Sequence, residues 1–456
     1  FDKVSSCWHE YGDGMWVKRE QVEAQQQISE LMDVGCTPIG YSHNKLTAVE
    51  KLLRMNLLHG IEASPPDLLP FKNGVLQIST RKILEHDSKY FLTWQLPYKY
   101  DIQAKAGPVI NWLTETLSGD KHQVEVIRAF GKAILVGQIS QMQKYIELIG
   151  AAGSGKSTLI RMLAIIVGQE AYYTTSLKAL EKSPFETANL HGKRLAAITD
   201  AETYSGDVTT LKAATGGDDL RYEVKNVQAS KPFKFIGGLI LAANQDVQSS
   251  DHSNGLQRRR ITLRLNVVIN PEDMKDLDPL FIENAAGIVN WMLDMEDEEM
   301  VKYLKTPEKM SAEIRKARKE QMLNTDSLYR WFNDNIELVP GHRSYIGNAI
   351  PFHMNLHPNI CSDVNEKLYP NYQSWAQGEA IKKTVSLQTF SKNLECLLVE
   401  KLTIPGIKKH HDSKGKYIEG IKIKSSIEVE TANNTLESET PNILDIRNNM
   451  VTSSHH

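Results

Sequence analysis

The stretch Gly150-Ala151-Ala152-Gly153-Ser154-Gly155-Lys156-Ser157 decides the fold class of this chain. The apolar run before it, Tyr145 to Ile149, is typical of a buried strand, and the residues after it repeat apolar side chains at helical spacing until Gly168. The order strand, glycine loop, helix fits G-x-x-x-x-G-K-[ST], a loop whose backbone N–H groups surround phosphate oxygens. It predicts a nucleoside triphosphate site on an α/β sheet.

The loop residues have separate tasks in this prediction. We expect Lys156 to reach the terminal phosphates of ATP and the Ser157 hydroxyl to bind Mg²⁺. A chance glycine-rich turn is the alternative, but the strand and the helix on its two sides argue against it. The residues expected to contact ATP are Gly150, Ala151, Ala152, Gly153, Ser154, Gly155, Lys156, Ser157 and Thr158.

Length and composition set the frame for this site. The chain has 456 residues, 41% of them hydrophobic and 24% charged, which is ordinary for a globular protein of about three domains. Its net charge of -3 means that a nucleic-acid surface must be local, for instance the inside of a pore. There is no signal peptide, no long apolar run and no C-x-x-C pair among the four cysteines, which favours a cytoplasmic protein of a bacterial host or a virus-infected cell, with no membrane contact. Because the chain begins at Phe1, we expect a piece of a larger protein.

A second apolar run, Arg194 to Thr199, predicts another buried strand, and it ends in Asp200-Ala201-Glu202. Magnesium that bridges two phosphates needs a carboxylate opposite Ser157, and an attacking water needs a second one. We therefore expect Asp200 to bind Mg²⁺, directly or through water, and Glu202 to activate the water. An ordinary acidic turn is the alternative.

A third strand, Phe235 to Ala242, is followed by Asn244, which we expect to hold the attacking water and contact the terminal phosphate. The basic residues before a fourth strand, Ile261 to Leu265, include candidates for an arginine finger that acts on the ATP of a neighbouring subunit. Arg259 or Arg260 is the expected finger, although the sequence leaves the choice among Arg258, Arg259 and Arg260 open. A surface cluster or an ion pair is the alternative interpretation.

Between the acidic strand and Asn244 lies a further segment. A short helix near 207–214 is followed by a predicted hairpin from Leu220 to Phe235, and the tip of that hairpin is rich in lysine.

The order of these motifs resembles superfamily 3 helicases, and in particular the helicase part of phage and plasmid primase-helicases and their poxvirus relatives. The likeness is carried by the glycine loop, Asp200-Ala201-Glu202, Leu211 to Asp218 with its lysine hairpin, and Ala243-Asn244. Weaker likeness in the flanks extends it over most of residues 60 to 425.

The resemblance implies an AAA+-like ATPase that forms a homohexameric ring on single-stranded or forked DNA, with ATP between subunits and hairpins in the pore. Lys225 is then the residue that contacts DNA phosphates, Lys231 is a second candidate, and Asn226 stands where some relatives have His. Relatives often carry a primase domain, which would lie before Phe1.

These observations predict an α/β fold with an N-terminal helical collar and a C-terminal winged helix. The expected parts are an accessory region at 1–100, the collar at 101–140, the ATPase at 141–300, the winged helix at 301–425 and a disordered tail at 426–456. In the winged helix, strands at Leu402 to Ile407 and Tyr417 to Ile423 would flank a basic tip whose Lys408 and Lys409 contact DNA. A solvated turn with no partner is the alternative for this tip.

The predicted function is an ATP-dependent replicative DNA helicase of a phage, plasmid or mobile element. Two alternatives remain open on the sequence alone. One is a DNA-binding initiator that uses ATP for assembly, and the other is an AAA+ ATPase that remodels proteins.

Overall fold

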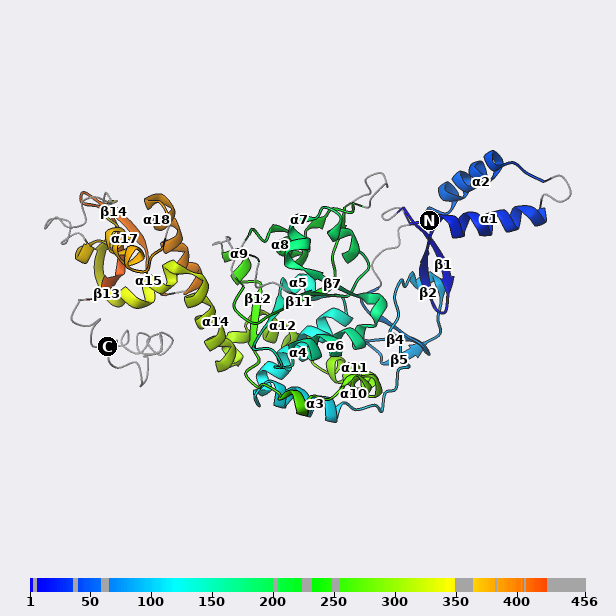
Figure 1. Ribbon diagram of the computed structural model, residues 1–456, viewed down its shortest axis with the longest axis horizontal. Helices are drawn as coiled ribbons and strands as arrows, with labels where there is room; N and C mark the ends of the chain where they lie inside the picture. The colour runs from blue at the N-terminus through cyan, green and yellow to red at the C-terminus, as the bar shows by residue number, and fades with distance from the viewer. Residues whose placement is uncertain are drawn as a thin grey trace. The chain divides into compact units, whose positions relative to one another are not determined.

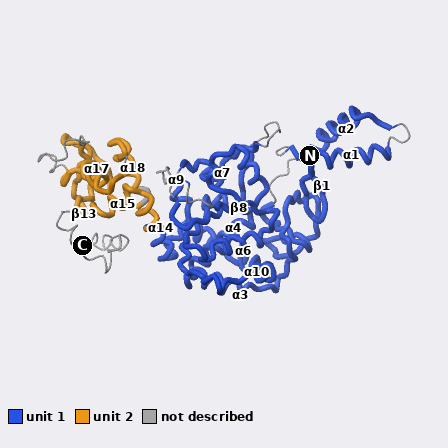
Figure 2. Tube along the Cα trace, viewed as in Figure 1, with its two compact units in different colours: residues 1–319 blue, residues 320–456 orange. Residues whose placement is uncertain are grey.

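The computed structural model describes residues 1–2, 6–35, 40–58, 65–199, 204, 206–223, 232–247, 254–348, 364–381, 384–402, 404–405 and 407–424. The chain forms two compact units, Phe1–Lys319 and Glu320–His456 (Figure 2). The accessory region, the collar and the ATPase segment all belong to the first unit, which also includes residues 301–319.

A five-stranded parallel sheet forms the centre of the first unit, in the order β12-β6-β11-β8-β7. The predicted parallel sheet is therefore confirmed, and the strand before the glycine loop lies in its interior. The strands are β6 (Tyr145–Ile149), β7 (Tyr172–Ser176), β8 (Leu195–Thr199), β11 (Gly238–Ala243) and β12 (Arg260–Arg264).

Helices cover both faces of this sheet (Figure 1), which is why its strands read as nearly continuous apolar runs. Ile146 and Leu148 of β6 belong to one hydrophobic core, and Tyr145 and Ile149 belong to the other. The first core is completed by α3 (Gly107–Thr116), α4 (Lys121–Leu135), α6 (Lys156–Val167), α10 (Asp278–Glu283), α11 (Ala285–Leu293) and α12 (Asp297–Lys305). The second core is completed by α7 (Leu177–Lys182) and α8 (Thr209–Gly216).

Two helices, α3 and α4, lie in the range 101–140 where the sequence predicts the collar. Asp120 caps α4 because its carboxylate accepts hydrogen bonds from the backbone N–H groups of His122 at 2.8 Å and Gln123 at 3.3 Å. Before the collar lie β1 (Trp8–Gly12), β2 (Met15–Arg19), α1 (Gln21–Gly35), α2 (His43–Asn56), β3 (Leu68–Phe71), β4 (Gly74–Gln77) and β5 (Lys82–Leu84).

In the described part of the second unit, helices α15, α17 and α18 pack against an antiparallel sheet of order β13-β15-β14. Buried Trp331 anchors this core, and its Nε1 donates to Asn371 Oδ1 at 2.7 Å. The elements are α15 (Ser327–Asn335), β13 (Ile336–Tyr345), α17 (Leu368–Gly378), α18 (Leu387–Cys396), β14 (Lys409–Asp412) and β15 (Gly415–Ile423).

One strand prediction in this unit is wrong, and one strand of the unit was not predicted. The first hairpin strand lies at Lys409–Asp412 and not at Leu402 to Ile407, and β13 was not predicted. The chain from Leu397 to Lys401 extends α18 as a π-helical turn, so the apolar residues there are helical. The polar run of β14 has no alternating apolar side chains that could have indicated a strand.

Candidate functional site

The register of the sheet brings the glycine loop and Asn244 together. Ile149, the last residue of β6, is paired with Ala243 on β11 and with Arg264 on β12. Gly150 and Asn244 each follow directly after one of these paired residues. The carboxyl ends of parallel strands are a common place for ligand sites in α/β folds, and the glycine loop and Asn244 lie there.

Lys156 connects the loop to Asn244. Its ammonium nitrogen Nζ donates to the carbonyl oxygens of Gly150 at 2.6 Å and Ala151 at 2.8 Å, and to Asn244 Oδ1 at 3.0 Å. Lys156 is the first residue of α6, so the N-terminus of that helix faces the same loop. A cation and free helical N–H groups at one place favour an anionic ligand.

The loop has the backbone geometry that this chemistry requires. A Cβ atom on Gly150 would lie 2.4 Å from the Leu265 carbonyl oxygen, and Gly155 has φ +90°, so both positions favour glycine. Ser154 is buried, and no partner for its Oγ lies within the described residues. Ser157 is exposed on the first turn of α6 and Thr158 is half-buried. A phosphate chain therefore fits the donors of this loop.

The structure adds an ion pair that the sequence analysis missed. Arg264, at the end of β12, binds Asp246 through one nitrogen that lies 3.0 Å from each carboxylate oxygen. The Asp246 side chain is 5% exposed. The pair joins the chain after β11 to β12 across the end of β6, and so fixes the edge where Asn244 lies. An aspartate two residues after Asn244 was the available sequence signal.

The three consecutive arginines differ sharply in their surroundings. Arg260 is buried, with its Nε 3.2 Å from Glu147 Oε2 and 2.8 Å from the Tyr145 hydroxyl oxygen. Arg259 is also buried, and its Nη1 donates to the Gly255 carbonyl oxygen at 2.8 Å. Arg258 is exposed. Arg260 thus takes part in an internal ion pair, and Arg258 is the accessible cation of the three.

The base of the predicted lysine hairpin is an antiparallel pair of β9 (Asp219–Leu220) and β10 (Phe233–Lys234). Rings of His191, Tyr222 and Phe233 meet edge to face beside it, with the His191 ring 5.1 Å from each of the other two. The base is therefore held by an aromatic cluster.

Five predicted site residues lie outside the described residues. Asp200 and Glu202 follow the end of β8, and the other three belong to the hairpin tip: Lys225, Asn226 and Lys231. Their roles stay predictions.

In the second unit, the basic hairpin residues are placed differently from expectation. Lys409 lies within β14, not at the tip, and its Nζ is 3.3 Å from Glu395 Oε2. Lys408 is exposed just before β14. His410 of β14 and Tyr417 of β15 are paired across the two strands, and their rings stack with centroids 5.3 Å apart.

None of the helices in the described residues is long and apolar enough to cross a bilayer. In the same residues, no group of three histidine, cysteine or acidic side chains could hold a metal ion. Asp200, the predicted magnesium ligand, lies outside these residues.

Two families match separate parts of the chain. Residues 4–118 match the family described as "D5 N terminal like", and residues 148–260 match a family of unknown function, DUF5906. The D5-like match supports the predicted resemblance to primase-helicases. The second match spans the glycine loop, Asn244 and the three arginines.

Solved structures that match the chain include the apo C-terminal region of NrS-1, at 15% identity, with 93% of this chain and 95% of that chain covered and a TM-score of 0.48. Another form of that region gives 15% identity, coverage of 93% and 96%, and a TM-score of 0.46. The phage P4 origin-binding domain is 19% identical, with 23% of this chain and 93% of that chain covered and a TM-score of 0.18. These values are too low to transfer any residue's role to this chain.

Proposed function

We propose that this chain is an ATP-driven DNA helicase that acts in the replication of a phage, plasmid or other mobile element. The observation that carries the proposal is the contact of Lys156 Nζ with Asn244 Oδ1 at 3.0 Å. It joins the glycine loop to the end of the adjacent parallel strand, where a terminal phosphate and its attacking water would lie.

In this proposal, the triphosphate of ATP binds to the backbone N–H groups of the glycine loop. The Lys156 ammonium exchanges the carbonyl oxygens that it now contacts for phosphate oxygens. Asn244 orients the attacking water, and the ion pair of Asp246 and Arg264 keeps Asn244 at the edge of the sheet. These tasks need no movement of the strands.

Mg²⁺, when bound, would be held by Ser157 and Asp200, and it would neutralise charge on the phosphates. Glu202 is proposed to take the proton of the attacking water. Both acids follow the end of β8, which pairs with β11 beside Asn244. The strand order thus supports acids and amide meeting at one edge.

We propose that the subunits form a homohexamer in which an arginine of one copy reaches the ATP of the next. Among the three candidates, Arg258 fits this task best because it is exposed. Arg260 would have to leave Glu147 buried without its partner before it could reach a neighbour.

DNA binding is assigned to the lysines of the hairpin, Lys225 and Lys231, with Lys408 of the second unit as a further contact. Lysines bind backbone phosphates without reading sequence, which suits movement along a strand. The aromatic cluster would keep the hairpin base rigid while the tip moves with the bound DNA strand.

The test is ATP hydrolysis and strand displacement by the full chain, measured with and without single-stranded DNA. Lys156→Ala should abolish hydrolysis, and Lys225→Ala should keep basal hydrolysis while it removes unwinding. DNA-stimulated hydrolysis that survives Lys156→Ala would reject the site. Normal unwinding by Lys225→Ala would reject the role of the hairpin, and a native mass of a single chain would reject the shared site.

A further inference from the structure

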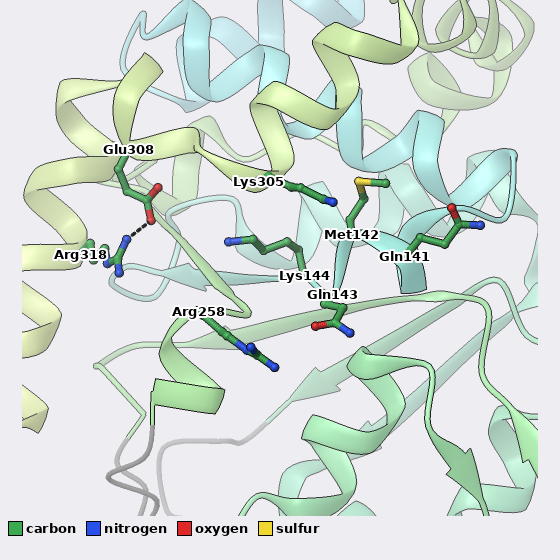
Figure 3. A pocket seen from close by; sticks show the side chains of 8 residues that line it. All are labelled: Gln141, Met142, Gln143, Lys144, Arg258, Lys305, Glu308 and Arg318. Carbon is green, nitrogen blue, oxygen red and sulfur yellow. Dashed lines mark hydrogen bonds and ion pairs between the residues drawn. The ribbon is translucent and has the colours of Figure 1, made fainter. Parts of the chain in front are cut away.

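A second cationic site lies at the opposite edge of the sheet from the glycine loop. Lys144 directly precedes β6, and Arg258 lies just before β12, so both stand at the amino ends of neighbouring strands. Across from them, Lys305 ends α12, and Arg318 belongs to α14 (Ala312–Thr325). Figure 3 shows these four side chains around one cavity of about 390 Å³, all within the first unit.

The charges in this cavity do not balance. Of the described residues that line it, four are cationic and one, Glu308 of α13 (Pro307–Met310), is acidic. The remaining lining residues are Gln141, Met142 and Gln143. Like charges held near one another in a partly buried place repel, so this arrangement favours an anion that enters the cavity.

Two observations describe the electrostatic surroundings of these cations. The Glu308 carboxylate pairs with Arg318, as the dashed line in Figure 3 marks. Burial, with Arg318, Arg258 and Lys305 nearby, lowers the pKa of Lys144 to about 8 despite the attraction of Glu308. The positive charge around Lys144 therefore exceeds the negative charge, and an anionic ligand could balance it.

We propose that this cavity binds a polyphosphate group and that Glu308 competes with it for Arg318. A polyphosphate places several charges in a small volume, and the two arginines can each bind phosphate oxygens through two N–H groups. Glu308 stands in for the ligand while the site is empty, and it leaves Arg318 when phosphate enters. Arg258, the proposed finger, also lines this cavity, so the test below leaves Arg258 unchanged and relies on Arg318 and Glu308.

The experiment measures binding of sodium tripolyphosphate by calorimetry to the full chain that carries Lys156→Ala, so that the glycine loop lacks its lysine. Arg318→Gln should weaken binding about tenfold, since it removes charge-assisted hydrogen bonds. Glu308→Gln should tighten binding several-fold because the competing charge is gone. Lys316→Gln, which removes an exposed cation of the same helix, is the matched control and should change nothing.

Unfolding of each variant without ligand shows whether it is folded, and Glu308→Gln alone carries the test if Arg318→Gln is not. Unchanged or weaker binding by Glu308→Gln would overturn the competition. Equal losses in Arg318→Gln and Lys316→Gln would overturn the site. A parallel titration with a single-stranded oligonucleotide separates the sources of phosphate: if these substitutions affect only oligonucleotide binding, the assignment to a polyphosphate is wrong.

Discussion

Replacement of Arg260 by alanine should destabilise the first unit strongly. The Glu147 side chain is 0% exposed and that of Arg260 is 6% exposed, so the substitution leaves a carboxylate buried without its cation. Loss of one partner of a buried pair costs about 3–5 kcal/mol. For a domain of this size, that loss corresponds to a fall in melting temperature of roughly 5–15 °C.

Calorimetric or circular-dichroism melting of the full chain measures this change, with Arg258→Ala as the control. Arg258 is exposed, so its loss should leave the melting temperature nearly unchanged. The double variant Glu147→Leu with Arg260→Met should recover most of the loss, because apolar residues can replace a buried pair. An Arg260→Ala protein that has the melting temperature of the wild type, yet lacks DNA-stimulated ATP hydrolysis, would refute this reasoning and favour Arg260 as the finger.

Three further predictions follow from single contacts. Burial lowers the pKa of Lys144 to about 8 from its ordinary 10.5. Between these pH values the unfolded chain binds more protons than the folded chain, so the free energy of unfolding should rise from pH 8 to 10.5. Lys144→Met should reduce that rise in denaturant titrations. Asp246→Ala removes the carboxylate that Arg264 Nη2 contacts and should weaken ATP binding about tenfold in fluorescence titrations, whereas an unchanged affinity would show that the pair is only structural. Lys408→Ala should lower the affinity of the chain for single-stranded DNA and its dependence on salt, while Lys409→Ala, which removes a residue paired with Glu395, should have the smaller effect.

The sequence predicted the local parts of the site well. The strand, glycine loop and helix are present, α6 ends at Gly168 as expected, and Asp120 caps α4. Such features depend on residues that are close in the chain, where glycines, caps and apolar spacing act directly. The sequence predicted Asn244 at the end of a strand of this sheet, and the pairing of β11 with β6 places it beside Gly150.

Features that depend on cross-strand register could not be predicted in the same way. Arg259 or Arg260 was expected to be the finger, but the pairing of Arg260 with Tyr145 brings the Arg260 side chain within reach of buried Glu147. The cationic cavity is built from segments as far apart as Gln141 and Arg318, and no local pattern marks it. Strand β14 was misplaced because its polar residues carry no alternation.

The most direct test of the central claim is the rate of ATP hydrolysis by the purified full chain, with and without single-stranded DNA, beside its Asn244→Ala variant. We predict that DNA stimulates the wild type and that Asn244→Ala loses most of this activity, because the amide that contacts Lys156 is gone. A wild-type chain that does not hydrolyse ATP, or an Asn244→Ala variant with the full stimulated rate, would contradict the account.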